Sequence, residues 1–181
     1  MFNDWRNFAD EKRKASLSLL PLVGVSACLL GQSVRYDGRD KYTALICDEL
    51  KQYCRLLAVC PEVEIGLGVP RAKIQLTQVG TSIKVLQMPE LRRDVSADLQ
   101  NFAIEFIKQH DLSALVLQDK SPSCGVGNTK LYSPSGEEIG LSSGLFAATI
   151  MEVFPDIQIV QASQLQTSED IVQFVKKLET K

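Results

Sequence analysis

Four short apolar runs alternate along this chain with longer segments of helical periodicity. The runs are LVGVSA, LLAV, LSALVLQ and IQIVQ, at residues 22–27, 56–59, 112–118 and 157–161. Segments with a helical pattern cover residues 42–53, 96–110, 145–154 and 168–178. This alternation predicts an α/β fold, a compact Rossmann-like three-layer domain with a mostly parallel sheet. Right-handed crossovers would bring the carboxyl ends of the strands to one rim of that sheet.

The rest of the chain is organised around this core. Residues 74–86 alternate well enough to predict a small hairpin that turns at 79–82, and residues 61–73 and 119–140 are predicted to be long loops. We expect Ser96 and Ser168 to cap the helices that begin there. Residues 1–16 have an amphipathic helical pattern, so we divide the chain into an N-terminal accessory extension, 1–20, and a single domain, 21–181.

Composition excludes several classes of protein. The 181 residues carry a net charge of −2 and are 45% hydrophobic, which disfavours both intrinsic disorder and a protein that coats nucleic acid. The first fourteen residues contain no apolar run typical of a secretory signal, and the apolar stretch at 17–30 is too short and too interrupted to span a bilayer. We therefore expect a cytoplasmic protein with no nucleic-acid partner and no membrane contact.

The chain has five cysteines and one histidine. In a reducing compartment five thiols are poor evidence for disulfides, and an odd number leaves one unpaired. Cys28, Cys60 and Cys124 each lie just beyond the end of a predicted strand, where loops from neighbouring strands converge on a ligand. Cys47 and Cys54 lie seven residues apart on one predicted helix, so we interpret them as core packing.

Three converging thiolates narrow the possible chemistry. A structural zinc ion normally needs four protein ligands, and a nucleophilic cysteine needs a neighbouring base. His110 is expected at the end of the sheet opposite the rim, which argues against it as that base. Thiolate is the usual ligand of an iron-sulfur cluster, and three thiolates would leave one iron of a cubane cluster open to substrate. The spacing alone leaves a cluster, simple packing and an isolated reactive thiol as alternatives.

Polar residues accompany these cysteines. Glu62 follows Cys60 closely, and it would serve as a general base or remain an ordinary exposed carboxylate. Ser121 and Ser123 flank a proline before Cys124, where their hydroxyls would orient a substrate or close the turn. The GLGVPR segment, which ends in Arg71, has the flexibility and charge to cradle an anion, but it lacks the third glycine of a dinucleotide fingerprint.

Three motifs in this order resemble the thiouracil desulfidase (TudS) family, a bacterial domain family. They are SACLLGQSVRYDG, VCPEVEIGLGVPR and DKSPSCG, and the resemblance covers roughly residues 22–160. It implies a compact α/β fold that holds an oxygen-sensitive 4Fe-4S cluster through one cysteine of each motif, here Cys28, Cys60 and Cys124. It also implies that Glu62 and Ser121 take part in catalysis, and it gives no role to the other two cysteines.

The resemblance further implies non-redox removal of sulfur from a thiolated pyrimidine such as 2-thiouracil or 4-thiouracil, which gives uracil and hydrogen sulfide. The open iron would take the thiocarbonyl sulfur, Glu62 would deprotonate a water, and Ser121 would hold the ring or relay a proton. The expected partner is a small thiolated nucleobase, and the expected state a monomer or weak homodimer. The alternatives are a non-catalytic iron-sulfur or zinc protein and a cysteine-nucleophile hydrolase.

Overall fold

A parallel four-stranded sheet forms the centre of the molecule. The computed structural model describes residues 19–89 and 93–179. In it, β1 (Leu22–Ser26), β2 (Arg55–Val59), β5 (Ala114–Leu117) and β8 (Gln158–Gln161) form a sheet in the order β2-β1-β5-β8. Every pair of neighbours in this sheet is parallel, so all four strands end at the same rim. The predicted strands and their convergence at one rim are confirmed.

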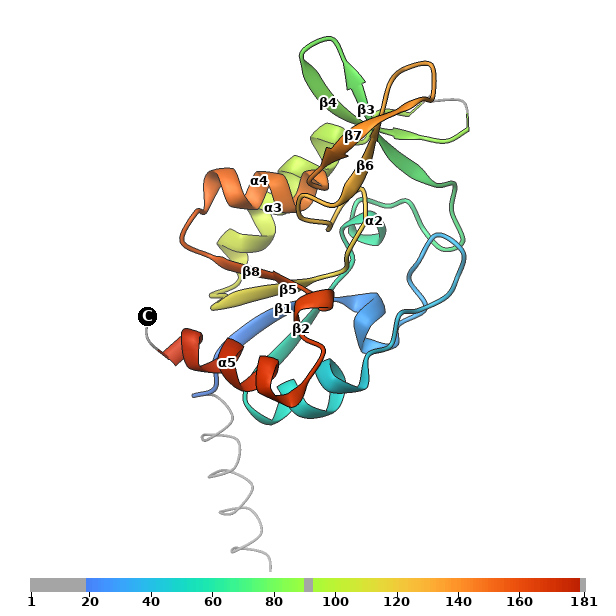
Figure 1. Cartoon of the computed structure of the whole chain (residues 1–181). Helices are drawn as coiled ribbons and strands as arrows, with labels where there is room; N and C mark the ends of the chain where they lie inside the picture. Colours follow the sequence, from blue (N-terminus) through green and yellow to red (C-terminus); the bar gives the residue numbers. More distant parts are fainter. Residues whose placement is uncertain (1–18, 90–92, 180–181) are drawn as a thin grey trace, which may run out of the picture.

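Helices cover both faces of this sheet (Figure 1). One face carries α3 (Ser96–Gln109) and α4 (Leu145–Val153); the other carries α5 (Ser168–Glu179), the π-helical turn η2 (Leu45–Glu49) and the 3-10 turn η3 (Leu50–Gln52). Side chains alternate along β5, so that Val116 packs under α5 while Leu115 and Leu117 pack under α3 and α4. Because both faces are buried, the strands are almost wholly apolar, and the three predicted layers are confirmed.

A second, mixed sheet lies beside the first. It has the order β4-β3-β6-β7, from β3 (Ile74–Val79), β4 (Ser82–Gln87), β6 (Thr129–Tyr132) and β7 (Glu138–Ser142). The hairpin predicted at 74–86 is confirmed as β3 and β4. The prediction of a continuous loop over 119–140 was wrong, because β6 and β7 lie mostly within that stretch. Both strands lack a buried apolar run of their own; β6 gains its place in the sheet by pairing with β3, and β7 by pairing with β6.

Some predicted helix boundaries also need correction. The helix expected at 42–53 is replaced by the shorter turns η2 and η3, and a one-turn helix, α2 (Pro61–Glu64), lies inside the predicted loop at 61–73. A 3-10 turn, η1 (Ala27–Leu30), follows β1 directly. Pro61 explains α2, because a proline at the first helical position has a fixed φ and gives up an N–H that would have no partner there.

Neither predicted serine cap has the expected role. The Ser96 Oγ accepts the N–H of Val85 in the neighbouring strand, and the Ser96 N–H donates to the Asp94 carboxylate. At α5 the capping residue is Thr167, whose Oγ1 accepts the N–H of Asp170. At α3 the serine hydroxyl is therefore bound by a neighbouring strand, and at α5 the cap lies one residue before the predicted one.

The N-terminal extension falls almost entirely outside the described residues, and so does the amphipathic helix predicted at 1–16. Across residues 19–89 and 93–179, no helix has the length and apolar character needed to cross a membrane.

Candidate iron-sulfur and substrate site

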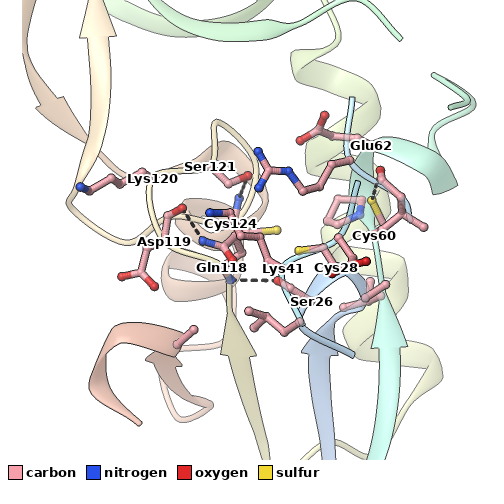
Figure 2. Close-up of a pocket in the computed structure, with 18 of the residues that line it drawn as sticks. Ser26, Cys28, Lys41, Cys60, Glu62, Gln118, Asp119, Lys120, Ser121 and Cys124 are labelled. Atoms are coloured by element: carbon pink, nitrogen blue, oxygen red, sulfur yellow. Dashed lines mark hydrogen bonds between the residues drawn. The ribbon is translucent and has the colours of Figure 1, made fainter. Parts of the chain in front are cut away.

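The rim of the parallel sheet encloses a pocket of about 1000 Å³. Residues that follow all four parallel strands line it, and they include Cys28, Cys60, Glu62, Ser121, Cys124 and Ser163. Figure 2 shows the three labelled cysteines gathered at the centre of this pocket. The predicted convergence of three thiols and their neighbouring polar residues at one site therefore holds in the structure.

Cys28 and Cys60 are placed by the turns that directly follow their strands. Cys28 lies in η1, is buried, and precedes Gly31, which ends the turn with a positive φ of 80° that suits glycine. Cys60 occupies the position before α2, and its carbonyl accepts the N–H of Val63 and that of Glu64. These bonds fix the backbone of Cys60, so the first turn of α2 carries Glu62 to the pocket.

Cys124 is held by a turn built around Ser121. The Ser121 Oγ accepts the N–H of Ser123 at 3.2 Å and that of Cys124 at 3.1 Å. The Ser121 carbonyl accepts the N–H of Gly125 and the hydroxyl of Thr129. Because the Ser121 oxygen already accepts two N–H groups, its own hydroxyl hydrogen is the part left to donate into the pocket.

The first turn of α4 packs against this cysteine loop. Gly144 and Leu145 donate their N–H groups to the carbonyls of Gly125 and Pro122. A Cβ at Gly144 would lie 2.5 Å from the Ser121 carbonyl oxygen. Only a glycine lets the helix approach the loop this closely, so α4 and the Cys124 loop form one packed unit.

Burial raises the pKa of all three pocket thiols. Burial raises the pKa of Cys28 to about 11, and the nearby charge of Cys60 adds to the rise. Burial also raises the pKa of Cys60, with the Glu62 carboxylate contributing, and that of Cys124, with Glu62 and both other thiols contributing. Cys28 and Cys124 therefore each feel the charge of another pocket thiol, which is expected of sulfurs gathered in one pocket.

Both oxygens of the Glu62 carboxylate have protein donors. Arg71 Nε donates to Oε2 at 2.9 Å, and the Ser123 hydroxyl donates to Oε1 at 3.1 Å. The Arg71 side chain is only 3% exposed and that of Glu62 14% exposed, so this ion pair is largely shielded from water. The pocket thus combines three thiols with one carboxylate whose orientation is fixed from two loops.

Comparison with known proteins identifies the family of this chain. A family model described as 2-thiouracil desulfurase matches residues 23–162. The chain belongs to the 2-thiouracil desulfurase family. The family resemblance predicted from the three cysteine motifs is therefore confirmed.

Two individual proteins illustrate this family relationship. The uncharacterized protein YbbK of Bacillus subtilis (strain 168) is 28% identical over 139 residues, which cover 72% of this chain and 90% of YbbK. A solved structure of the 4Fe-4S-dependent thiouracil desulfidase TudS superposes with a TM-score of 0.66 at 29% identity. That match covers 87% of this chain and 99% of the TudS chain, so the whole TudS fold is present here.

The pocket thiols can be compared with the ligands that a 4Fe-4S cluster, as named for TudS, would need. All five cysteines are free of disulfides. Within the part of the chain that the structure describes, no three His, Cys, Asp or Glu side chains are arranged to hold a single metal ion. A 4Fe-4S cluster holds its thiolates around a body of several atoms, so their sulfurs lie farther apart than the ligands of one ion. Three free thiols that line one pocket match the donor type that such a cluster takes.

The remaining titratable candidates lie away from the pocket. Cys54 is buried in the core under α5, as expected, but it follows η3 rather than sharing a helix with Cys47. Cys47 is half-buried, and its thiol donates to the Leu29 carbonyl at 3.2 Å. His110 follows α3, and its ring meets that of Phe106 edge-on. The expectation that His110 lies away from the rim is confirmed, since it does not line the pocket.

A polar network around Asp119, which also lines the pocket, was not predicted from the sequence. The Asp119 carboxylate accepts bonds from the Asn128 amide and from the N–H and hydroxyl of Ser163, and Asn128 also donates to the Gln161 side chain. This network ties the loop after β5 to the segment after β8. The fourth predicted strand, at 157–161, also ends at the rim. The polar residues that follow it could therefore have been predicted to line the pocket.

Proposed function

We propose that this chain is an iron-sulfur-cluster-dependent desulfidase that removes sulfur from thiolated pyrimidines of the 2-thiouracil and 4-thiouracil type. The observation that supports it most is the gathering of three thiols and an oriented carboxylate in one pocket at the sheet rim. Membership of the 2-thiouracil desulfurase family and the likeness to TudS give the substrate class and the cofactor.

Cys28, Cys60 and Cys124 are the proposed ligands of a 4Fe-4S cluster. Their thiols are buried together and have raised pKa values, so binding a cationic cluster requires them to release protons. When bound, a cluster with three protein ligands supplies a Lewis-acidic iron that polarises a thiocarbonyl.

Glu62 is the proposed general base. Its carboxylate faces the pocket and is held by Arg71 and Ser123, so it can accept a proton from a water placed beside the substrate ring. Hydroxide adds to the ring carbon of the C=S group, the carbon–sulfur bond breaks, and the sulfur leaves with two protons. The balance is C=S plus H₂O gives C=O plus H₂S, with no change of oxidation state.

Ser121 is the proposed donor to the substrate ring. Its oxygen is engaged by two backbone N–H groups, so its hydroxyl hydrogen is available to hold a ring oxygen or to pass a proton. Ser123, in contrast, donates to Glu62 and orients the base. The two serines of the SPSCG segment therefore have different proposed roles.

The rival function as a cysteine hydrolase is disfavoured by the same pocket. A nucleophilic cysteine needs a lowered pKa, whereas burial raises the pKa of each of the three pocket thiols. A cluster carrier without turnover has no use for the oriented carboxylate of Glu62. The single domain over 21–181, the cytoplasmic location and the monomer or weak homodimer stay predictions.

Anaerobic reconstitution with iron and sulfide tests the proposal. We expect a brown protein with about four iron atoms per chain. It should convert 2-thiouracil or 4-thiouracil to uracil, followed by loss of thiocarbonyl absorbance and by release of hydrogen sulfide. A colourless protein that binds less than one iron per chain would exclude the cluster.

Two glutamate variants separate the base from its surroundings. Glu62→Gln should keep the iron and lose turnover by about a hundredfold or more, the usual contribution of a general base. Glu64→Gln is the matched control, because Glu64 lies on the same short helix, is exposed and does not line the pocket. Turnover by Glu62→Gln at the unsubstituted rate would show that another group is the base.

A further inference from the structure

Arg71 ends the GLGVPR segment and connects loops from two different strands. Its Nε donates to Glu62 Oε2 at 2.9 Å, and its Nη1 donates to the Val34 carbonyl at 2.8 Å and to the Gly68 carbonyl at 2.9 Å. Its backbone N–H donates to the Tyr36 carbonyl. Val34 and Tyr36 belong to the loop after β1, whereas Glu62 and Gly68 follow β2. Arg71 therefore fixes two walls of the pocket relative to each other.

The contacts of Arg71 are directed and buried. A guanidinium is planar and carries its donors in a fixed fork, so three acceptors in different directions define its position completely. With its side chain 3% exposed, water competes little for these donors. Lysine has one donating nitrogen on a flexible stem, so it keeps the charge but cannot reproduce this pattern.

The same contacts orient Glu62. Arg71 holds Oε2 from the loop after β2, and Ser123 holds Oε1 from the loop after β5, so the carboxylate plane is fixed at both ends. The Val34 carbonyl that Arg71 contacts also accepts the Cys60 thiol at 3.8 Å. The guanidinium thus aligns the carboxylate with the wall that carries one of the proposed cluster ligands.

We infer that Arg71 is a positioning residue that acts through Glu62: it fixes the carboxylate in the orientation that accepts a proton from the attacking water. This inference rests on the proposed function of Glu62 as the base. A misplaced base lowers the rate of the chemical step without changing how the substrate binds. Arg71 itself need not touch the substrate.

A double-mutant cycle tests this inference in the reconstituted full chain. Arg71→Lys should lower kcat on 2-thiouracil by about thirtyfold to a hundredfold while KM and iron content stay close to those of the unsubstituted protein. In the Glu62→Gln background the same substitution should lower kcat by less than about threefold, because its route to the reaction is already gone. Arg39→Lys is the matched control, since the Arg39 side chain is 82% exposed and does not line the pocket.

The outcomes distinguish the two proposals. If Glu62→Gln keeps full turnover, the proposed base is wrong whatever Arg71 does. If Glu62→Gln loses turnover and the losses in the two variants multiply, Arg71 acts independently of Glu62 and only the inference is overturned. If Arg71→Lys raises KM or loses iron with kcat per bound cluster unchanged, Arg71 has a purely structural role, which also overturns it. Arg71→Gln gives a second variant for the cycle if the lysine variant does not fold.

Discussion

The parallel sheet and the mixed sheet of this molecule bury their side chains in different ways. The parallel sheet is covered by helices on both faces, and its strands are almost continuously apolar. The mixed sheet buries one face, against α3 and the start of α4, and its edge strand β7 is exposed along most of its length. The parallel sheet ends in the loops that carry the three pocket thiols. The sheet that is apolar on both faces is therefore also the one whose loops hold the three pocket thiols.

Two cysteines of the same hydrophobic core offer the strongest test of that comparison. Cys28 and Cys54 are both buried in the cluster under α5, but only Cys28 lines the pocket at the rim. Cys28→Ala should lose essentially all cluster iron after reconstitution, whereas Cys54→Ala should keep it, because only the first removes a proposed ligand. Iron analysis and the visible spectrum measure both. Retention of the cluster by Cys28→Ala, or its loss in Cys54→Ala, would contradict the ligand assignment.

Matched leucines, one in each sheet, test the difference in burial. Leu115 in β5 is fully buried, and Leu115→Ala should lower the free energy of unfolding by about 2–5 kcal/mol through lost burial and a residual cavity. Leu141 in β7 is 61% exposed, and Leu141→Ala should change it by less than about 0.5 kcal/mol. Urea unfolding of both variants provides the measurement. A similar cost for both would mean that β7 is covered in solution.

Cys54, in the core of the parallel sheet, should make the free energy of unfolding of the cluster-free protein fall at high pH. Burial raises the pKa of Cys54 to about 11 from its ordinary value of 9.0. Above pH 9 the unfolded chain loses this proton first, so the free energy of unfolding falls as the pH rises towards 11, by about 1–3 kcal/mol for this group.

Substitution of Cys54 checks that assignment. Urea unfolding at several pH values between 8 and 11 should give a shallower fall for Cys54→Ala than for the unsubstituted protein. The buried core of the mixed sheet contributes no thiol, so it adds nothing to this dependence. Equal slopes for the two proteins would assign the pH dependence to other groups.

The difference in burial between the two sheets also explains which strands could be predicted from the sequence. The parallel strands could be found because burial on both faces leaves a continuous apolar run that can be read directly. In β7 the alternation is present but faces outwards: Ile139 and Leu141 are exposed, while the residue paired with Leu131 is Gly140. An alternation whose apolar side is exposed carries no information about a core, so β7 and its partner β6 were missed.

The site was predictable to a similar degree. Placing Cys28, Cys60 and Cys124 at one rim needed only strand ends and parallel topology. The contacts of the Glu62 carboxylate depend on the conformations of two irregular loops. Residue spacing therefore could not show that Arg71 pairs with Glu62, or that Ser123 rather than Ser121 donates to it. Short motifs locate the residues of the pocket, and the loops around them decide which atoms meet.

The close approach of α4 to the Cys124 loop limits how far the site can be transplanted. The carbonyls of the SPSCG segment are bound by the N–H groups at the start of that helix, and Gly144 leaves the room for them to do so. Grafting the three cysteine segments onto another parallel sheet would bring the thiols without the helix N-terminus that holds the Cys124 loop. A designer who wants this pocket on a new scaffold must import a glycine twenty residues downstream of the last thiol, at 144 against 124, together with its helix.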